Sequence, residues 1–149
     1  HVDSSAASDV YKRQLLLNEF SILAENSKCK FLSLQKGYGE EQLKDCFFKD
    51  KFVDFQKEVS DIWDFVETSS IIANCDLIIT SDSAIAHLAA GMGKKTWLLL
   101  QKIPDWRWGL KGSHTFWYEN MEIFRQVERN NWREVMIRVS IRLNNFLNN

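Results

Sequence analysis

The stretch CDLIITSDSAIAHLAAGMGKKTWLLL, residues 75–100, sets an alanine-rich segment between two largely apolar runs. The runs Leu77–Thr80 and Thr96–Leu100 are continuous rather than alternating, which is typical of strands in a parallel sheet covered on both faces. Ser83–Met92 between them is small, apolar and long enough for a helix. The order strand, helix, strand predicts an α/β domain.

Segments on both sides of this unit continue the alternation. Further strands are predicted at KFLSLQ (30–35), KFVDF (51–55) and MEIFRQ (121–126), and further helices over residues 14–24, 40–46, 60–75 and 130–147. We therefore expect a Rossmann-like three-layer sandwich over residues 14–149, with a mostly parallel sheet between helices.

Two of these helices carry specific predictions. The 60–75 helix is expected to begin with Ser60 as its N-cap and Asp61 in its first turn, where a carboxylate suits the helix dipole. Its predicted buried stripe is Ile62, Phe65, Val66, Ile72 and Ala73. The predicted inner face of the last helix is Trp132, Val135, Met136, Val139, Leu143 and Phe146.

The composition is that of one soluble globular domain. The chain has 149 residues and a net charge of −1, with no basic cluster that would indicate nucleic acid as a partner. No apolar run is long enough for a membrane span and no secretory leader pattern opens the sequence, so we expect a cytoplasmic protein. Cys29, Cys46 and Cys75 lack metal-type spacing, which favours reduced thiols. Residues 1–13 are small, polar and aperiodic, and we expect a non-native or disordered tail there.

The carboxyl ends of the strands indicate where a ligand would bind. In parallel α/β sheets, ligands bind beyond these ends and against helix N-termini. This rule selects three loops, Gln35–Glu40, Thr80–Ser83 and Gln101–His114.

The second loop is the strongest candidate, because free backbone N–H groups and the positive end of a helix dipole meet there. The residues predicted to meet a ligand are Ser81, Asp82, Ser83, Ala84, Ala86 and His87. Small side chains would let a phosphate approach the backbone, the serines add hydroxyl donors, and His87 lies one turn along the same face. A phosphate or diphosphate suits this arrangement best. The alternative is that Ser81 or Asp82 merely caps a helix and His87 is an ordinary helix residue.

Two glycine motifs near these loops are weaker signals. GMGKKT (91–96) lacks the P-loop spacing and leads from a helix into a strand, so Gly91 or Gly93 is interpreted as the helix C-cap. GYGEEQ (37–42) lacks the third glycine of a dinucleotide fingerprint. Lys36 and Gly37 could still contact a phosphate, and a solvated surface lysine is the alternative.

The loop IPDWRWGLKGSHTFWYE (103–119) combines five aromatic residues with Asp105, Arg107 and His114. Such a loop at the open end of a sheet is suited to stacking on a base or a sugar. The alternative is that these aromatic side chains are buried and anchor a long loop. No Ser-His-Asp order, metal-type His/Cys cluster or close carboxylate pair is evident, so we assign no catalytic residue and no metal.

The string from Asp76 to Gln126 resembles the C-terminal half of family 9-type glycosyltransferases. These include heptosyltransferases and the glycosyltransferase-like domains attached to tetratricopeptide repeats. The similar segments are CDLIITSDSAIAHLAAGMGKKTWLLL, PDWRWGL and FWYENMEIFRQ, with FLSLQKGYGEEQL as an earlier match. The resemblance extends over Leu15 to Leu147.

This resemblance implies a GT-B architecture, in which two Rossmann-like domains flank the active site and the C-terminal one binds the donor. By position, the motif from Ser81 to His87 would meet the donor diphosphate, and Lys36 and Gly37 would line the nucleotide pocket. Asp105–Arg107 match a family loop to which we assign no role. Such enzymes work without a metal as a rule, so we expect a nucleotide-diphosphate-sugar as donor substrate and no cofactor.

The chain also departs from the family pattern. Members normally carry another strand and a basic loop before the first helix, preceded by an acceptor domain, and these are absent from the sequence. We therefore expect a truncated donor-binding half that is inactive alone, with an exposed sheet edge that would favour a homodimer. Two alternatives are a non-catalytic Rossmann-like interaction module and half of a sugar-nucleotide epimerase, which shares the two-domain fold.

Overall fold

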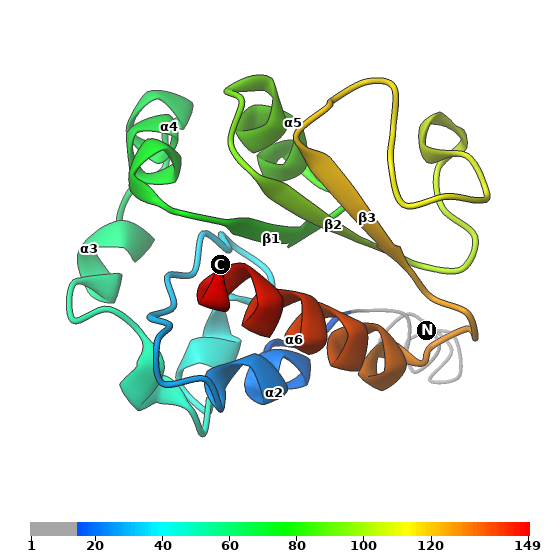
Figure 1. Cartoon of the computed structure of the whole chain (residues 1–149). Coiled ribbons are helices and arrows are strands. Elements are labelled where there is room, and N and C mark those ends of the chain that lie inside the picture. Colours follow the sequence, from blue (N-terminus) through cyan, green and yellow to red (C-terminus); the bar gives the residue numbers. More distant parts are fainter. Residues whose placement is uncertain (1–14) are drawn as a thin grey trace, which may run out of the picture.

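The computed structural model describes residues 15–149, and the predicted tail at residues 1–13 lies outside them. Three parallel strands form a sheet in the order β1-β2-β3 (Figure 1). The strands are β1 (Ile78–Ser81), β2 (Thr96–Leu100) and β3 (Met121–Arg125). The helices are α2 (Ser21–Ala24), α3 (Gln56–Ser60), α4 (Phe65–Asn74), α5 (Ala84–Gly91) and α6 (Trp132–Asn148), with 3-10 turns at Leu17–Phe20, Glu40–Leu43, Lys49–Lys51 and Trp106–Trp108. The predicted α/β fold with a parallel sheet is confirmed.

The middle strand β2 organises the core on both sides of the sheet. All five of its residues are buried, and successive side chains point to opposite faces. Trp97 and Leu99 pack against α6, whereas Leu98 and Leu100 pack against Ala86 and the other small residues of α5. Helices therefore cover both faces as predicted, with α4 and α5 above the sheet and α2 and α6 below it in Figure 1.

Helix α6 buries the predicted inner face. Trp132, Val135, Met136, Val139 and Leu143 are buried, and Phe146 packs partly buried beside them. The side chain of Asn131 caps the helix by accepting a hydrogen bond from the Glu134 N–H at 3.3 Å. Within residues 15–149, no helix is long and apolar enough to cross a membrane.

The strands predicted at residues 30–35 and 51–55 do not form. The two segments meet only in one parallel bridge between Phe31 and Phe52, built from two backbone hydrogen bonds of 2.9 Å. A strand requires a continued ladder, and no strand among residues 15–149 lies between residues 30–35 and β1 to continue it.

The helix predicted over residues 60–75 is divided into two. Ser60 is the last residue of α3, and α4 begins after Asp64. The Asp64 carboxylate accepts a hydrogen bond from the Glu67 N–H at 2.8 Å, so Asp64 and not Ser60 is the N-cap.

Of the predicted buried stripe of this segment, only Ile72 is buried. Ile72 is fully buried against Ile78 of β1 and Ala89 of α5. The members of the stripe that are exposed or only half-buried are Ile62, Phe65, Val66 and Ala73. The stripe fails because, of its members, only Ile72 packs in the cluster with β1 and α5.

The GMGKKT segment closes α5 as predicted. Gly93 has φ +78°, the left-handed conformation that glycine adopts without steric cost. The Gly93 N–H donates to Ala90 O and the Lys94 N–H donates to Ala89 O, both at 3.0 Å. These two bonds form a Schellman motif, which satisfies the last carbonyls of the helix. The segment is a helix exit and not a phosphate loop.

The cap of α4 can be tested by substitution. Asp64→Ala removes the acceptor of the Glu67 N–H and should lower the free energy of unfolding by about 1 kcal/mol in urea denaturation. Asp61→Ala, at the exposed position that the sequence favoured for the first turn, should change it by less than about 0.5 kcal/mol. A larger loss of stability in Asp61→Ala than in Asp64→Ala would mean that the helix begins at Ser60, as the sequence analysis predicted.

Candidate functional site

The turn between β1 and α5 presents backbone N–H groups at the carboxyl edge of the sheet. β1 ends at Ser81, and Ser83 occupies the N-cap position of α5 with an extended backbone. Its hydroxyl does not cap the helix and lies 3.1 Å from the Thr80 hydroxyl instead. Within residues 15–149, the first N–H groups of α5 therefore have no side-chain cap, which is the arrangement that an anion needs.

His87 lies one turn into α5, and three neighbours hold its ring. Its Nδ1 is 3.0 Å from the Tyr118 hydroxyl, and its Nε2 is 3.3 Å from Nη1 of Arg107. The ring also stacks on Trp108, with centroids 5.4 Å apart and planes inclined by 24°. Because a guanidinium only donates, Nε2 is the acceptor and the Nδ1 proton is donated to the Tyr118 oxygen. The network thus selects one tautomer and one ring orientation.

Asp82 adds a negative charge at the same place. Its Oδ1 is 4.0 Å from His87 Nε2, and about one third of each side chain is exposed. A carboxylate here opposes an incoming anion, so a phosphate at this turn also needs a cation close by. The guanidinium of Arg107, which contacts His87, is a cation close to this turn.

Arg107 is anchored by Asp105 in the loop after β2. The Nε and the backbone N–H of Arg107 both donate to Oδ1 of Asp105, at 2.8 and 3.1 Å. The side-chain hydrogen bond lowers the pKa of the Asp105 carboxyl and raises the pKa of the guanidinium. The indole N–H of Trp117 donates to Arg107 O at 3.0 Å, which ties both ends of the loop together.

Arg125 of β3 anchors the same loop and was not singled out by the sequence. Its guanidinium donates to the backbone carbonyls of Trp108, Gly109, Lys111 and Gly112. Burial lowers the pKa of Arg125. No local pattern predicts this role, because the acceptors are backbone groups 13 to 17 residues away.

A cleft of about 1140 Å³ opens beside the β1–α5 turn. The loop residues in its wall are Gln35, Tyr38, Gly39, Ser81, Asp82, Ser83, Gln101, Pro104 and Asp105. All three loops that were selected thus contribute to one cleft. The loops after β1 and β2 leave the same edge of the parallel sheet, and residues 35–39 line the cleft although residues 30–35 do not form a strand.

Other predicted contact residues are not in the wall of this cleft. The Nζ of Lys36 donates to Val59 O and Ser60 O, at 2.5 and 2.8 Å, so it neutralises the C-terminal end of α3 instead. Gly37 forms a left-handed turn beside it and does not line the cleft. Ala86 is completely buried against the sheet, which leaves no side-chain surface for a ligand.

The aromatic loop contains both a plug and exposed rings. Trp108 is 3% exposed and packs in the core, as one alternative expected. Trp106 and Phe116 are 82% and 86% exposed, and the Phe116 ring lies 4.6 Å from that of Trp117. The loop therefore has an anchored centre and an apolar outer surface available for stacking.

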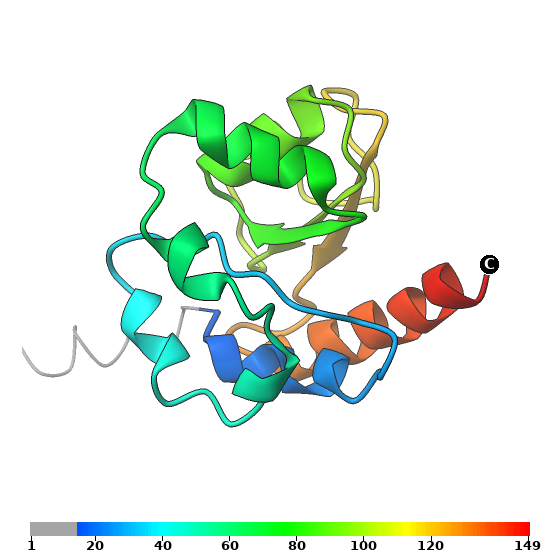
Figure 2. The same cartoon turned by 90° about the vertical axis from the view of Figure 1, so that its left-hand side faces the viewer.

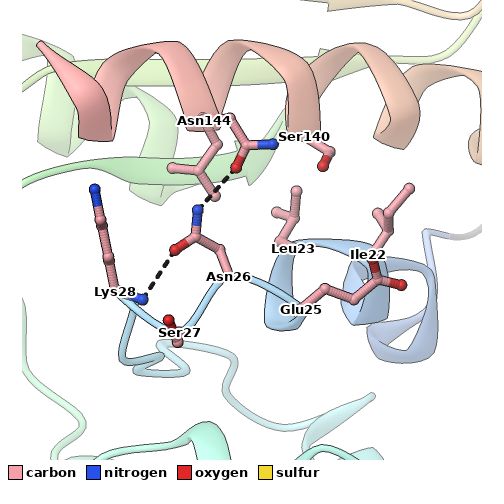
Figure 3. Close-up of a pocket in the computed structure, with 9 residues that line it drawn as sticks. Ile22, Leu23, Glu25, Asn26, Ser27, Lys28, Ser140 and Asn144 are labelled. Carbon is pink, nitrogen blue, oxygen red and sulfur yellow. Dashed lines mark hydrogen bonds between the residues drawn. The ribbon is translucent and has the colours of Figure 1, made fainter.

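A smaller cavity of about 350 Å³ lies between α2 and α6 (Figure 3). Here Asn26 Nδ2 donates to Asn144 Oδ1 at 2.8 Å, and the Lys28 N–H donates to Asn26 Oδ1 at 2.9 Å. These bonds join the loop after α2 to α6, so we interpret the cavity as a packing junction. In the part of the chain that the structure describes, no cluster of three or more His, Cys, Asp or Glu side chains could hold a metal.

The family model for glycosyltransferase family 9 (heptosyltransferase) matches residues 54–133, more than half of the chain. The chain belongs to glycosyltransferase family 9. The match contains the β1–α5 turn, His87 and the aromatic loop, so the geometry above belongs to a glycosyltransferase-type domain. No curated protein and no solved structure matches this chain.

The ion pair between Asp105 and Arg107 of the family 9 domain should depend on pH. Because the pKa of Asp105 is lowered, its carboxyl is ionised and paired with Arg107 at neutral pH. The pair is lost as the pH falls through the pKa of folded Asp105, which lies below the ordinary pKa of aspartate. NMR titration of the Asp105 carboxyl carbon measures this pKa, and Arg107→Gln should return it toward the ordinary value. A pKa that does not change on substitution would show that the pair does not form in solution.

The loop anchor makes a second prediction. Arg125→Met removes four hydrogen bonds to the 108–112 backbone and should speed tryptic cleavage after Lys111 at least about tenfold. Arg142→Met is the matched control, because Arg142 contacts Glu122 and not the loop. Equal cleavage rates in both variants would mean that Arg125 does not hold the loop.

Proposed function

We propose that this chain is the donor-binding domain of a metal-independent glycosyltransferase and that the β1–α5 turn binds the diphosphate of a nucleotide sugar. The observation that supports this most directly is the uncapped N-terminus of α5, whose turn residues Ser81–Ser83 line the cleft. His87, whose ring is oriented by Tyr118 and Arg107, lies one turn along the helix and outside the cleft wall. Membership of glycosyltransferase family 9 supports glycosyl transfer as the reaction class.

The proposed role of the turn is to stabilise the leaving diphosphate. As the bond from the sugar to the diphosphate breaks, negative charge grows on the phosphate oxygens. Backbone N–H groups and the helix dipole meet that charge without reorganising. Arg107 has further N–H donors beyond those used by Asp105 and His87, and these would face the same oxygens.

Recognition of the rest of the donor is assigned to the same cleft. The Tyr38 ring is 72% exposed in the wall formed by residues 35–39, where it could stack on a base or a sugar. We propose a GT-B arrangement in which a second domain supplies the acceptor and the catalytic base. The chain alone should then bind its donor without transferring the sugar.

Calorimetry with ADP-, GDP- and UDP-sugars tests the function. We expect saturable binding of donors that carry one of these bases, and no release of free sugar. If no donor binds the folded chain, the proposal fails and the non-catalytic interaction module is favoured. Inversion of a sugar stereocentre in the recovered donor, detected by NMR, would favour the epimerase alternative.

The site assignment has its own test in Ser83→Asp. The new carboxylate can cap the α5 N–H groups and repel phosphate, so donor affinity should fall by at least about tenfold. The melting temperature should stay equal or rise, because Asp is as good an N-cap as Ser. Ser27→Asp adds the same charge in the loop after α2 and should leave binding unchanged. Unaltered affinity in Ser83→Asp would place the diphosphate elsewhere.

A further inference from the structure

Residues 61–67 (DIWDFVE) form an exposed surface at the start of α4, which we call the acidic surface. Its large apolar side chains Trp63, Phe65 and Val66 are 69%, 62% and 77% exposed. The same seven residues carry three carboxylates and no cation, and within residues 15–149 none of these carboxylates forms an ion pair. Large apolar side chains gathered on a surface in this way are typical of an interaction site.

Local hydrogen bonds hold the backbone of the acidic surface. Besides capping α4, Asp64 accepts at its backbone oxygen a hydrogen bond from the Thr68 hydroxyl at 2.7 Å. The Ile62 N–H donates to Val59 O at 3.2 Å, which joins the segment to α3. A partner that covers the exposed side chains therefore does not have to order the backbone that carries them, and this lowers the cost of binding.

Residues 102–117, in the loop after β2, form a second exposed surface, which we call the basic surface. Three of its apolar side chains are at least 75% exposed: Trp106, Leu110 and Phe116. Lys102 and Lys111 are exposed too, and neither forms an ion pair in the part of the chain that the structure describes. The one carboxylate of this surface, Asp105, is already paired with Arg107, so a positive charge is left over.

Hydrogen bonds also hold the basic surface together. Arg125 bonds to four backbone carbonyls between residues 108 and 112, and the Trp117 indole bonds to Arg107 O. The Trp117 ring lies beside that of Phe116, with centroids 4.6 Å apart. These contacts join the two halves of the loop, so its exposed side chains belong to one preformed surface.

The two surfaces match each other in charge and in apolar content. Each exposes two aromatic rings and one aliphatic side chain, and the unpaired carboxylates of one correspond to the unpaired lysines of the other. Figure 1 shows α4 at the left of the molecule and the turn Trp106–Trp108, in yellow-green, at the right. One chain therefore cannot bring its own two surfaces together, whereas two copies can.

We propose that copies of this chain associate head to tail, with the basic surface of one copy covering the acidic surface of the next. Charge complementarity sets the orientation, and burial of the aromatic rings supplies the affinity. Each covered ring removes on the order of 150 Å² from water, so the three side chains of a surface provide roughly half of the about 800 Å² that each partner contributes to a stable interface. Because the two surfaces differ, the association continues beyond a dimer.

Sedimentation velocity of the whole chain between about 1 and 500 µM tests the proposal, and the mean mass should rise past that of a dimer. Asp61→Lys with Glu67→Lys reverses the acidic surface, and Lys102→Glu with Lys111→Glu reverses the basic surface. Each double variant alone should need an at least about tenfold higher concentration to associate, because like charges then meet. An equimolar mixture of the two should associate like the unsubstituted chain, because every positive surface again meets a negative one.

Two single substitutions test the apolar contacts separately from the charges. Trp63→Ser and Trp106→Ser each remove an exposed ring without touching the core, and each should weaken association at least about tenfold. The matched control for the charge reversals is Glu25→Lys with Asp45→Lys, which makes the same change at exposed positions outside both surfaces and should leave association unchanged. Thermal melting by circular dichroism checks that every variant is folded.

Four results would overturn the proposal. These are a chain that stays monomeric over the whole range, a mass that stops at a dimer, association that the charge reversals do not alter, and a mixture of the reversed variants that fails to associate. The third result would assign the association to another surface of the chain. None of these measurements involves a donor, so this test and that of the proposed function fail independently.

Discussion

Burial of β2 on both faces is the constraint on which the rest of the structure depends. Each of its large side chains contributes about 2 kcal/mol when it leaves water, and they alternate between the α6 side and the α5 side of the sheet. Ala86 and Ala90 are small enough for α5 to lie close to the sheet. This packing places the N-terminus of α5 directly after β1, and so the candidate anion site is a consequence of the core.

The long loop after β2 is connected to that site through His87. Trp108 fixes the loop centre in the core and stacks on the imidazole, while Arg107 and Tyr118 approach its two nitrogens from either end of the loop. Arg125 holds the intervening backbone through its carbonyls. A change in the contacts of Trp108, Arg107 or Tyr118 should alter the position of the His87 ring and so affect the β1–α5 turn. The membership of family 9 gives this geometry a chemical context, glycosyl transfer, in which stabilising a departing diphosphate is useful.

Predictions succeeded where the signal was local and strong. Continuous apolar runs identified β1 and β2, the period of 3.6 identified the inner face of α6, and the glycines after α5 indicated its end. They failed where a partner elsewhere in the chain decides the outcome. Residues 30–35 have strand composition but lack a neighbour on one edge. Lys36 follows a predicted strand end, yet its ammonium group reaches the carbonyls at the end of α3, a contact that no spacing rule contains.

The sequence by itself determined the fold class, the order of the elements and the turn at Ser81–Ser83 as the place where a strand meets a helix N-terminus. Apolar periodicity and helix-end chemistry act over a few residues, so they can be recognised without coordinates. Only the tertiary structure decided which side chains surround that turn. It brought Arg107 and Tyr118 to His87, turned Lys36 away, and left a gap beside β1, because long-range packing and hydrogen bonding depend on the whole chain.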